Sequence, residues 1–198
     1  MPPELAMELP IIKEILDAMK ISNLEIDGFE ADDIIGTISR IAEGKGISPL
    51  IITGDKDALQ LSGKITKVLI TKRGITDFEY DYDKMLERYE LTPQQFIDLK
   101  GLMGDSSDNI PGIPGVGEKT GIKLLKQFGS VANLLKNTEE IKNEKLRNKV
   151  EENAQLAAMS RSLAEINRFV PLDIDFEDFR CEEPDSDKII ELYTKLEF

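Results

Sequence analysis

Seven carboxylate residues, grouped in three short clusters, are the side chains of this sequence best suited to chemistry. The clusters are Glu30, Asp32 and Asp33, then Asp55 and Asp57, then Asp105 and Asp108. The chain has no histidine and one cysteine, which excludes histidine-based acid–base catalysis, catalytic triads and cysteine–histidine zinc sites. Carboxylates suit hard cations such as Mg²⁺ and Mn²⁺, and two such ions roughly 4 Å apart can activate water to attack a phosphodiester.

Each cluster taken alone also has an ordinary structural interpretation. The first could cap the free N–H groups of a helix, the second could be a solvated turn, and the third could supply an N-cap and a turn residue. None has the spacing of an EF-hand calcium loop. The three together favour a metal site, because acidic residues at the carboxyl end of a sheet and at a neighbouring helix start can point into one cleft.

A glycine-rich turn that leads into a lysine-bearing helix is the second distinctive feature, at residues 109–126. It is not a nucleotide-binding P-loop, because Glu118 separates Gly117 from Lys119 and because no strand is expected before it. We predict a tight hairpin between two helices, in which Gly115 and Gly117 permit positive φ and let a phosphate approach backbone N–H groups.

Three lysines of the helix after this turn are spaced to lie on one helical face. They are Lys119, Lys123 and Lys126. Such a face beside a helix N-terminus can follow a DNA backbone, which fixes position without reading bases. The alternative is a plain connection between two helices with a solvated lysine face.

Hydrophobic periodicity indicates alternating strands and helices up to about residue 80 and mostly helices afterwards. Helices are expected at 10–20, 31–44, 92–103, 118–128, 130–135, 143–164 and 186–196. Strands are expected at 24–26, 49–53, 67–70 and 76–80, with a turn at Arg73 and Gly74 before the last. The strand at 49–53 has no polar alternation, which is typical of a buried parallel strand.

The expected fold class is therefore α/β, with a mostly parallel sheet and flanking helices. This sheet and its helices occupy residues 1–80, and a helical region over residues 81–198 packs with them as one unit. The length of 198 residues and a hydrophobic content of 40% allow one large or two small domains with a real core. No apolar run is long enough to cross a membrane, and the first residues lack a signal pattern.

The overall charge argues against a nucleic-acid ligand. The formal net charge is −13 at pH 7, whereas nucleic acids favour basic surfaces. Only a local basic patch, such as the lysine face, can answer this objection.

Four motifs occur in the order found in a known nuclease family. They are Gly-Phe-Glu-Ala-Asp-Asp at 28–33, Thr-Gly-Asp-Lys-Asp at 53–57, Gly-Asp-Ser-Ser-Asp-Asn-Ile-Pro-Gly at 104–112 and Gly-Val-Gly-Glu-Lys-Thr at 115–120. In combination they resemble the 5′–3′ exonuclease domain of bacterial DNA polymerase I, a member of the flap endonuclease family. The resemblance runs from about Pro2 to Phe198.

The resemblance implies a PIN-like nuclease core with two divalent metal ions, Mg²⁺ or Mn²⁺. All seven clustered carboxylates would be metal ligands or lie next to them, and Asp32, Asp55 and Asp57 would be the catalytic residues. The glycine turn would be a helix–hairpin–helix element, with a monovalent cation such as K⁺ on its backbone. The DNA-binding residues that the resemblance implies are Gly115, Gly117, Lys119, Thr120, Lys123 and Lys126.

One departure from the family pattern concerns the start of the resemblance. Family members open with a strand that carries an Asp in an Asp-Gly-Asn context, then a second strand with another metal-binding Asp, then a basic and aromatic arch. Met1 aligns only after these elements. We therefore expect an incomplete nuclease core that lacks about the N-terminal third of the usual domain, a segment that another chain could supply.

The sequence thus predicts a metal-dependent nuclease that hydrolyses double-stranded DNA at a 5′ flap or end. By resemblance, a polymerase domain would share the parent chain, and the location would be the bacterial cytoplasm at the nucleoid. The alternative is a catalytically impaired DNA-binding fragment that keeps only backbone binding. A scaffold with no DNA role would fit the charge but would leave the order of the motifs unexplained.

Overall fold

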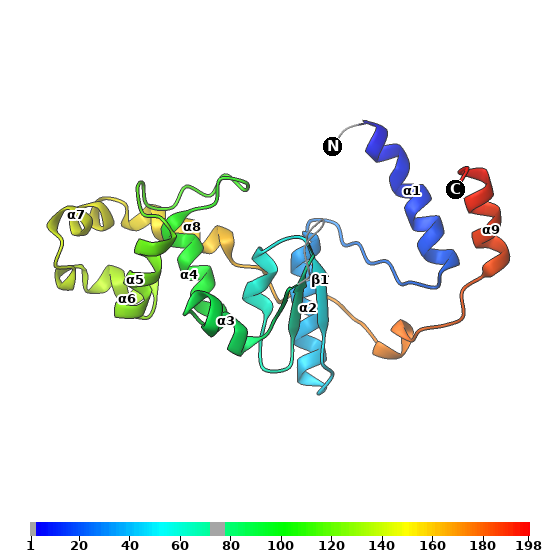
Figure 1. The fold of residues 1–198 in the computed structure, drawn as a ribbon, viewed down its shortest axis with the longest axis horizontal. Coiled ribbons are helices and arrows are strands. Elements are labelled where there is room, and N and C mark those ends of the chain that lie inside the picture. The colour runs from blue at the N-terminus through cyan, green and yellow to red at the C-terminus, as the bar shows by residue number, and fades with distance from the viewer. Residues whose placement is uncertain (1–2, 72–77) are drawn as a thin grey trace. The chain divides into compact units, whose positions relative to one another are not determined.

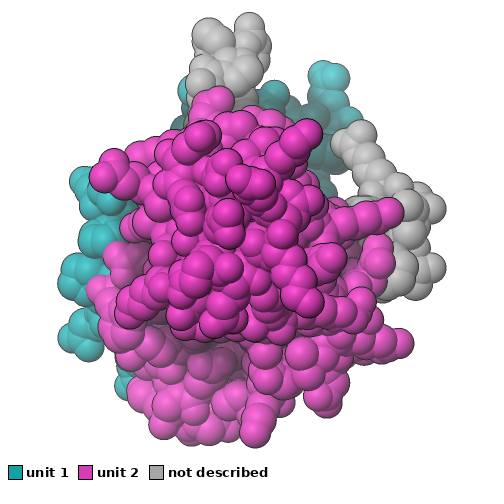
Figure 2. All heavy atoms as spheres, turned by 90° about the vertical axis from the view of Figure 1, so that its left-hand side faces the viewer, with its two compact units in different colours: residues 1–34, 170–198 teal, residues 35–169 magenta. Residues whose placement is uncertain are grey.

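The computed structural model describes residues 3–71 and 78–198, and the chain divides into two compact units. Unit 1 comprises residues 1–34 and 170–198, and unit 2 comprises residues 35–169, drawn in teal and magenta in Figure 2. This division follows packing rather than chain order, and the expected domains at 1–80 and 81–198 stay a prediction. Among the described helices, none combines the length and the apolarity that a membrane crossing needs.

The sheet of unit 2 has three strands in the order in which they occur in the chain, β1 (Leu50–Thr53), β2 (Lys67–Ile70) and β3 (Phe78–Tyr80). β1 runs parallel to β2, and β3 returns antiparallel to β2. The α/β fold class is confirmed, with a small mixed sheet. The turn expected at residues 73–74 lies outside the described residues, and the strand expected at 24–26 is wrong, because that described segment pairs with no strand.

β1 is buried on one face only, so the expectation of a fully buried strand is wrong. Ile51 is 7% exposed and faces the core, whereas its neighbours Leu50 and Ile52 are 53% and 62% exposed. Successive side chains of a strand point to opposite faces, and in this sheet the core covers only the Ile51 face. An apolar run therefore does not by itself distinguish a strand covered on both faces from one covered on a single face.

Helices make up most of the rest of unit 2. The periodic helix expected at 31–44 is α2 (Ala31–Gly44), which continues across the boundary between the units. After the sheet follow α3 (Tyr82–Tyr89), α4 (Pro93–Met103), α5 (Glu118–Phe128), α6 (Val131–Lys136), α7 (Glu144–Glu152) and α8 (Ala154–Ala164). Short 3₁₀ turns occur at Asp57–Leu61 and Thr138–Glu140 in unit 2, and at Phe176–Phe179 in unit 1. Figure 1 shows their arrangement along the chain.

Local capping explains where several of these helices begin and end. Thr92 caps α4, accepting a hydrogen bond from the Gln95 N–H, while the Gln95 side chain accepts one from the Thr92 N–H. The Ser130 hydroxyl caps α6 by accepting a hydrogen bond from the Asn133 N–H, and α5 ends before Gly129, as expected. The expected single helix over 143–164 is wrong: it divides at Asn153, whose side-chain amide donates to the Lys149 carbonyl at 2.8 Å and ends α7.

α4 is the central helix of unit 2, and nearly all of its residues are buried. It contacts α8 so closely that a Cβ atom at Gly101 would lie 2.6 Å from the Cβ atom of Arg161. The buried Asp98 carboxylate accepts a hydrogen bond from the Val131 N–H at 3.2 Å and another from the Arg161 guanidinium at 3.1 Å. Polar as well as apolar contacts therefore join α4 to the start of α6 and to α8.

Unit 1 pairs α1 (Pro3–Ala18) with α9 (Ser186–Lys195), which lie side by side (Figure 1). The Asp185 N–H donates to the Ala18 carbonyl at 2.8 Å. The helix expected to begin at Pro10 begins instead at Pro3, so Pro10 lies inside α1. A proline inside a helix removes one backbone donor, and its ring crowds the carbonyl four residues earlier. α1 nevertheless continues through Pro10, so the position of this proline did not mark the start of the helix.

The contact between α4 and α8 generates a stability prediction. Gly101→Ala should lower the free energy of unfolding by about 1–3 kcal/mol, because the new methyl group must separate the two helices, and this outweighs the better helix propensity of alanine. Gly44→Ala is the matched control, because Gly44 also lies in a helix but has no atom within 4 Å of its Cβ position. Urea denaturation measures both, and equal effects would contradict the account of this contact.

Candidate functional site

The turn after β1 places Asp57 at the carboxyl end of the strand. The Asp55 N–H donates to the Thr53 hydroxyl at 3.0 Å, and the Asp57 N–H donates to the Asp55 carboxylate at 2.9 Å. The 3₁₀ turn Asp57–Leu61 starts at once and is anchored by buried apolar side chains. The motif at 53–57 therefore lies at the carboxyl end of β1, as its position after an apolar strand predicts.

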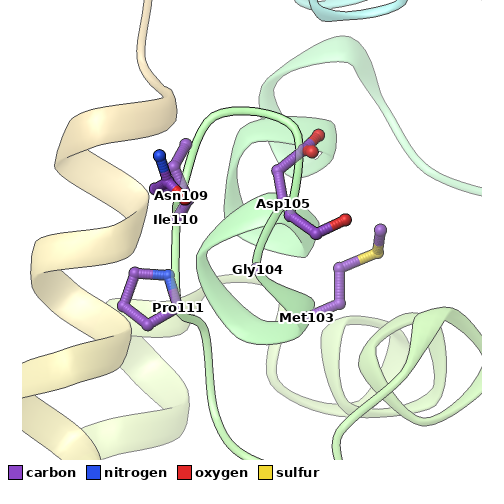
Figure 3. A pocket seen from close by; sticks show the side chains of 7 residues that line it. Met103, Gly104, Asp105, Asn109, Ile110 and Pro111 are labelled. Atoms are coloured by element: carbon purple, nitrogen blue, oxygen red, sulfur yellow. The ribbon is translucent and has the colours of Figure 1, made fainter.

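The loop after α4 carries the third carboxylate cluster. Asp105 and Ile110 form an isolated bridge, in which each N–H donates to the other residue's carbonyl at 2.8 Å. The Asp105 carboxylate also accepts hydrogen bonds from the N–H and the hydroxyl of Ser107. Figure 3 shows Asp105 on one limb of this loop and Asn109 and Ile110 on the other. The loop lines an open pocket, whose residues are Met103, Gly104, Asp105, Ser106, Asn109, Ile110 and Pro111.

Two glycines close the base of this loop. Gly104 and Gly112 have φ angles of 75° and 60°, and a Cβ atom on Gly112 would lie 2.2 Å from the Gly104 nitrogen. The Gly112 N–H donates to the buried Ser160 hydroxyl of α8 at 3.0 Å. Any side chain at either glycine would force the backbone apart, so the two glycines of the motif at 104–112 are required by the geometry of the loop.

Three carboxylates from two separate motifs converge in unit 2. One oxygen atom from each of Asp57, Asp105 and Asp108 lies within 4.8 Å of the others, and these three form the candidate metal group found in the described part of the chain. The all-oxygen donor set fits a hard divalent cation. Asp55 lies outside this group, and its carboxylate already accepts the Asp57 N–H.

Lys100 is the one residue of this region that the sequence reasoning missed, and it lies between two of the three carboxylates. Its ammonium group is 2.5 Å from an Asp57 oxygen and also forms an ion pair with Asp105. Its side chain is only 10% exposed. The signal in the sequence was a lysine flanked by apolar residues in the last turn of the helix before Asp105.

The surroundings shift the pKa values of Asp105, Asp57 and Lys100 for different reasons. Hydrogen bonds from Lys100 and Ser107 lower the pKa of Asp105 to about 2. Burial raises the pKa of Asp57, and the hydrogen bond and charge of Lys100 offset this only in part. Burial also acts to lower the pKa of Lys100, but hydrogen bonds to Asp105 and Asp57 outweigh it and the pKa is raised. Asp105 is therefore ionised, and Lys100 charged, at neutral pH.

The first carboxylate cluster belongs to unit 1. Glu30 precedes α2, and Asp32 and Asp33 lie in the first turn of that helix. The Glu30 N–H donates to the Asp33 carboxylate at 3.4 Å, so a carboxylate of the first turn reaches back to the backbone N–H just before the helix. The metal-binding role of Glu30, Asp32, Asp33 and Asp55, and the catalytic role of Asp32, Asp55 and Asp57, stay predictions.

The glycine turn is less compact than the expected tight hairpin between two helices. α4 ends at Met103 and α5 begins at Glu118, so the carboxylate loop and the turn share one connection. The turn itself is closed by the Val116 N–H, which donates to the Ile113 carbonyl at 3.0 Å. Gly115 has a φ angle of 77°, whereas Gly117 has a φ of −97° and a ψ of 180°, so only Gly115 uses the positive φ that both glycines permit.

α5 has a buried apolar face and an exposed basic face, as expected. Gly121, Leu124, Leu125 and Phe128 are buried, while all three lysines of the opposite face are exposed. Lys126 differs from Lys119 and Lys123 in forming an ion pair with Glu90. Thr120 is half-buried, and its N–H donates to the Gly117 carbonyl at 3.0 Å.

A further lysine lies at the tip of the turn. The Lys149 ammonium group of α7 is 2.6 Å from the position that a Cβ atom would take on Gly115. Any side chain at Gly115 would displace this ammonium group. The sequence reasoning did not select Lys149, because only the fold brings α7 beside the turn.

Two family descriptions match successive parts of the chain. Residues 1–90 match the 5′–3′ exonuclease N-terminal resolvase-like domain, and residues 91–187 match the 5′–3′ exonuclease C-terminal SAM fold. The chain belongs to the 5′–3′ exonuclease family. The expected resemblance is thereby confirmed, and the motifs that carry it supply all three carboxylates of the group in unit 2.

Relatives of this 5′–3′ exonuclease family chain include DNA polymerase I of Bacillus caldotenax, which is 46% identical over all 198 residues. The chain spans 23% of the length of that polymerase. Among solved structures, a bacteriophage T5 D15 flap endonuclease in complex with DNA and metal ions is 26% identical, with a TM-score of 0.64 over 73% of this chain and 52% of that one. The catalytic core of Rad2 in complex with DNA is 22% identical with a TM-score of 0.67, covers 100% of this chain and 67% of that one, and shares the fold.

The low pKa of Asp105 generates a prediction about acid stability. Because folding lowers the pKa from 3.8 to about 2, the ionised carboxylate stabilises the fold fully above about pH 4, and this contribution is lost as the pH falls through about 2. Without metal, Asp105→Asn should therefore lower the free energy of unfolding by on the order of 1–2 kcal/mol at pH 5, and by progressively less towards pH 2. Urea denaturation at each pH measures the difference, and a pH-independent difference would refute the assignment.

Proposed function

We propose that this chain forms part of a structure-specific 5′–3′ exonuclease or 5′-flap endonuclease domain, which hydrolyses DNA phosphodiesters with two divalent metal ions. The observation that carries the proposal is the convergence of Asp57, Asp105 and Asp108 within 4.8 Å, from two motifs that lie far apart in the sequence. The metal-bound and DNA-bound state of the T5 D15 flap endonuclease, which is 26% identical, supports the same assignment.

Asp57, Asp105 and Asp108 would hold one of the divalent ions. When bound, such an ion lowers the pKa of a water molecule and stabilises negative charge on a phosphodiester oxygen. The chain's own contribution is positional: the Gly104–Gly112 contact and the Asp105–Ile110 bridge hold two of the carboxylates on one rigid loop. The proposed metal-binding role of Glu30, Asp32, Asp33 and Asp55 rests on the resemblance of their motifs to the family.

The glycine turn and α5 would bind the backbone of duplex DNA. Because Gly115 has no side chain, the Lys149 ammonium group lies beside the turn, where a phosphate would meet its charge. Gly117 is the N-cap of α5, and the positive end of the helix dipole faces the same region. Lys119, Lys123 and Lys126, with Thr120 on the first turn, would continue along the phosphates, and a K⁺ ion could bind the backbone carbonyls of the turn. Lys149 adds a further positive charge beside Gly115.

This arrangement answers the objection raised by the net charge. The chain carries −13 overall, yet the exposed face of α5 presents three lysines beside a turn that lies next to Lys149. A local concentration of positive charge governs phosphate binding at close range, because exposed charges more than about 8 Å away are largely screened at physiological salt. Binding to DNA therefore depends on this face rather than on the sum of charges.

A second candidate function is a DNA-binding module without catalysis. The observation in its favour is Lys100, whose ammonium group already neutralises part of the carboxylate group in unit 2. In that case the α5 face would bind DNA normally, while the carboxylates would bind divalent ions weakly.

A cleavage assay on a 5′-flap duplex with Mn²⁺ tests the proposed function. The native chain should cleave the flap, and the double variant Asp105→Asn with Asp108→Asn should lose about a hundredfold or more of this activity, because the metal group loses two of its three charges. The variant should still bind the duplex in EDTA. No cleavage with salt-sensitive binding would favour the binding module, and neither cleavage nor binding would reject both DNA functions.

The salt dependence of duplex binding tests the role of α5. Lys119→Ala with Lys123→Ala should weaken binding uniformly across sequences and reduce the slope of log affinity against log salt by about 2, since each phosphate contact contributes about 0.9. Lys67→Ala is the control, because this exposed lysine pairs with Glu79 on the sheet. An unchanged slope in the double variant would contradict backbone binding by α5.

A further inference from the structure

Lys100 occupies an unusual position for a lysine. It lies in the most buried stretch of α4, between Leu99 and Gly101, and the whole residue is 8% exposed. Its ammonium group bridges an Asp57 oxygen at 2.5 Å and the Asp105 carboxylate. A buried ammonium group is costly unless it is paired, so these two ion pairs explain why the fold tolerates this lysine.

The same two carboxylates belong to the group that would hold a divalent ion. Asp57 and Asp105 each contribute an oxygen to the set that converges within 4.8 Å with Asp108. A positive charge that is already within ion-pair distance of two of three ligands repels an incoming cation and uses part of their negative charge. At about 4 Å in a partly buried site, such a repulsion is large compared with thermal energy.

We propose that Lys100 is a built-in cation of this carboxylate group, which a divalent ion must displace in order to bind. The inference rests on the proposed metal site and adds a competitor to it. In the metal-free protein, Lys100 offsets the repulsion between Asp57 and Asp105 and keeps the two carboxylates together. A divalent ion replaces the single charge of Lys100 with two charges.

A neighbouring cavity offers the displaced ammonium group a place to move. The cavity has a volume of about 180 Å³, and Lys100, Asp105 and Glu118 all line it. The four-carbon stem of lysine is flexible, so the ammonium group can rotate away from Asp57 without a backbone change. Glu118, at the start of α5, supplies another carboxylate on the wall of the same cavity.

Mn²⁺ titration of the full chain, followed by calorimetry or by the signal of free Mn²⁺ in electron paramagnetic resonance, tests this role. Lys100→Met should bind Mn²⁺ about tenfold or more tightly than the native chain, because the competing charge is gone. Lys100→Arg keeps the charge and should stay near native affinity. Lys67→Met removes an ion-paired lysine on the sheet and should change nothing. Circular dichroism in EDTA checks that each variant is folded.

A second measurement uses the native chain and does not depend on the folding of any variant. Amine-specific labelling, read by mass spectrometry, should modify Lys100 slowly without metal and several-fold faster with saturating Mn²⁺, while labelling of Lys67 stays constant. Unchanged labelling of Lys100, or Mn²⁺ affinity that Lys100→Met leaves unchanged or weakens, would overturn the inference alone. Absence of Mn²⁺ binding in the native chain and in Lys100→Met would overturn the metal site as well.

Discussion

At the end of α4, the backbone of Gly112 lies so close to that of Gly104 that a Cβ atom at position 112 would come within 2.2 Å of the Gly104 nitrogen. This contact closes the loop that carries Asp105 and Asp108, and it directs the chain into the turn before α5. The Ser160 hydroxyl of α8 anchors the base of the loop by accepting a hydrogen bond from the Gly112 N–H. The close contact between Gly104 and Gly112 thus positions both Asp105 and Asp108 and the start of the basic helix α5. Both positions depend on the packing of α4 against α8.

The electrostatics of the site follow from that packing. The Lys100 ammonium group lies near the end of the buried helix α4 and pairs there with Asp105, and Asp57 approaches it from the carboxyl end of β1. The resulting cluster alternates negative and positive charge within a partly dehydrated space, where charge interactions exceed those at the surface. The same geometry that gathers ligands for a metal ion therefore also supplies an internal cation that competes with it.

Much of the fold followed from local patterns in the sequence. The capping box at Thr92, the cap at Ser130 and the stop at Gly129 each depend on neighbouring residues, so the sequence alone predicted them. Other features did not follow from these patterns. The exposed face of β1 depends on which elements cover the sheet. The division of α7 from α8 coincides with a local hydrogen bond from Asn153 to the Lys149 carbonyl four residues earlier, which the apolar periodicity of 143–164 does not reveal.

The site was predictable to a similar degree. Asp57 and Asp105 were selected because each follows a recognisable strand or helix, and Asp108 was selected because it belongs to the same motif as Asp105. Lys100 and Lys149 were not predicted, because a lysine within a helix is usually solvated, and only the packing of α4 and α7 brings these two to the carboxylates and to Gly115.

The proposed function requires that Asp57, Asp105 and Asp108 form a divalent metal site. Anomalous X-ray scattering from crystals of this chain soaked in Mn²⁺ tests it most directly, because the signal locates the ion without reference to activity. We expect an anomalous peak within about 2.5 Å of oxygen atoms of these three carboxylates. A structure in which Mn²⁺ binds elsewhere while these carboxylates carry no peak would contradict it.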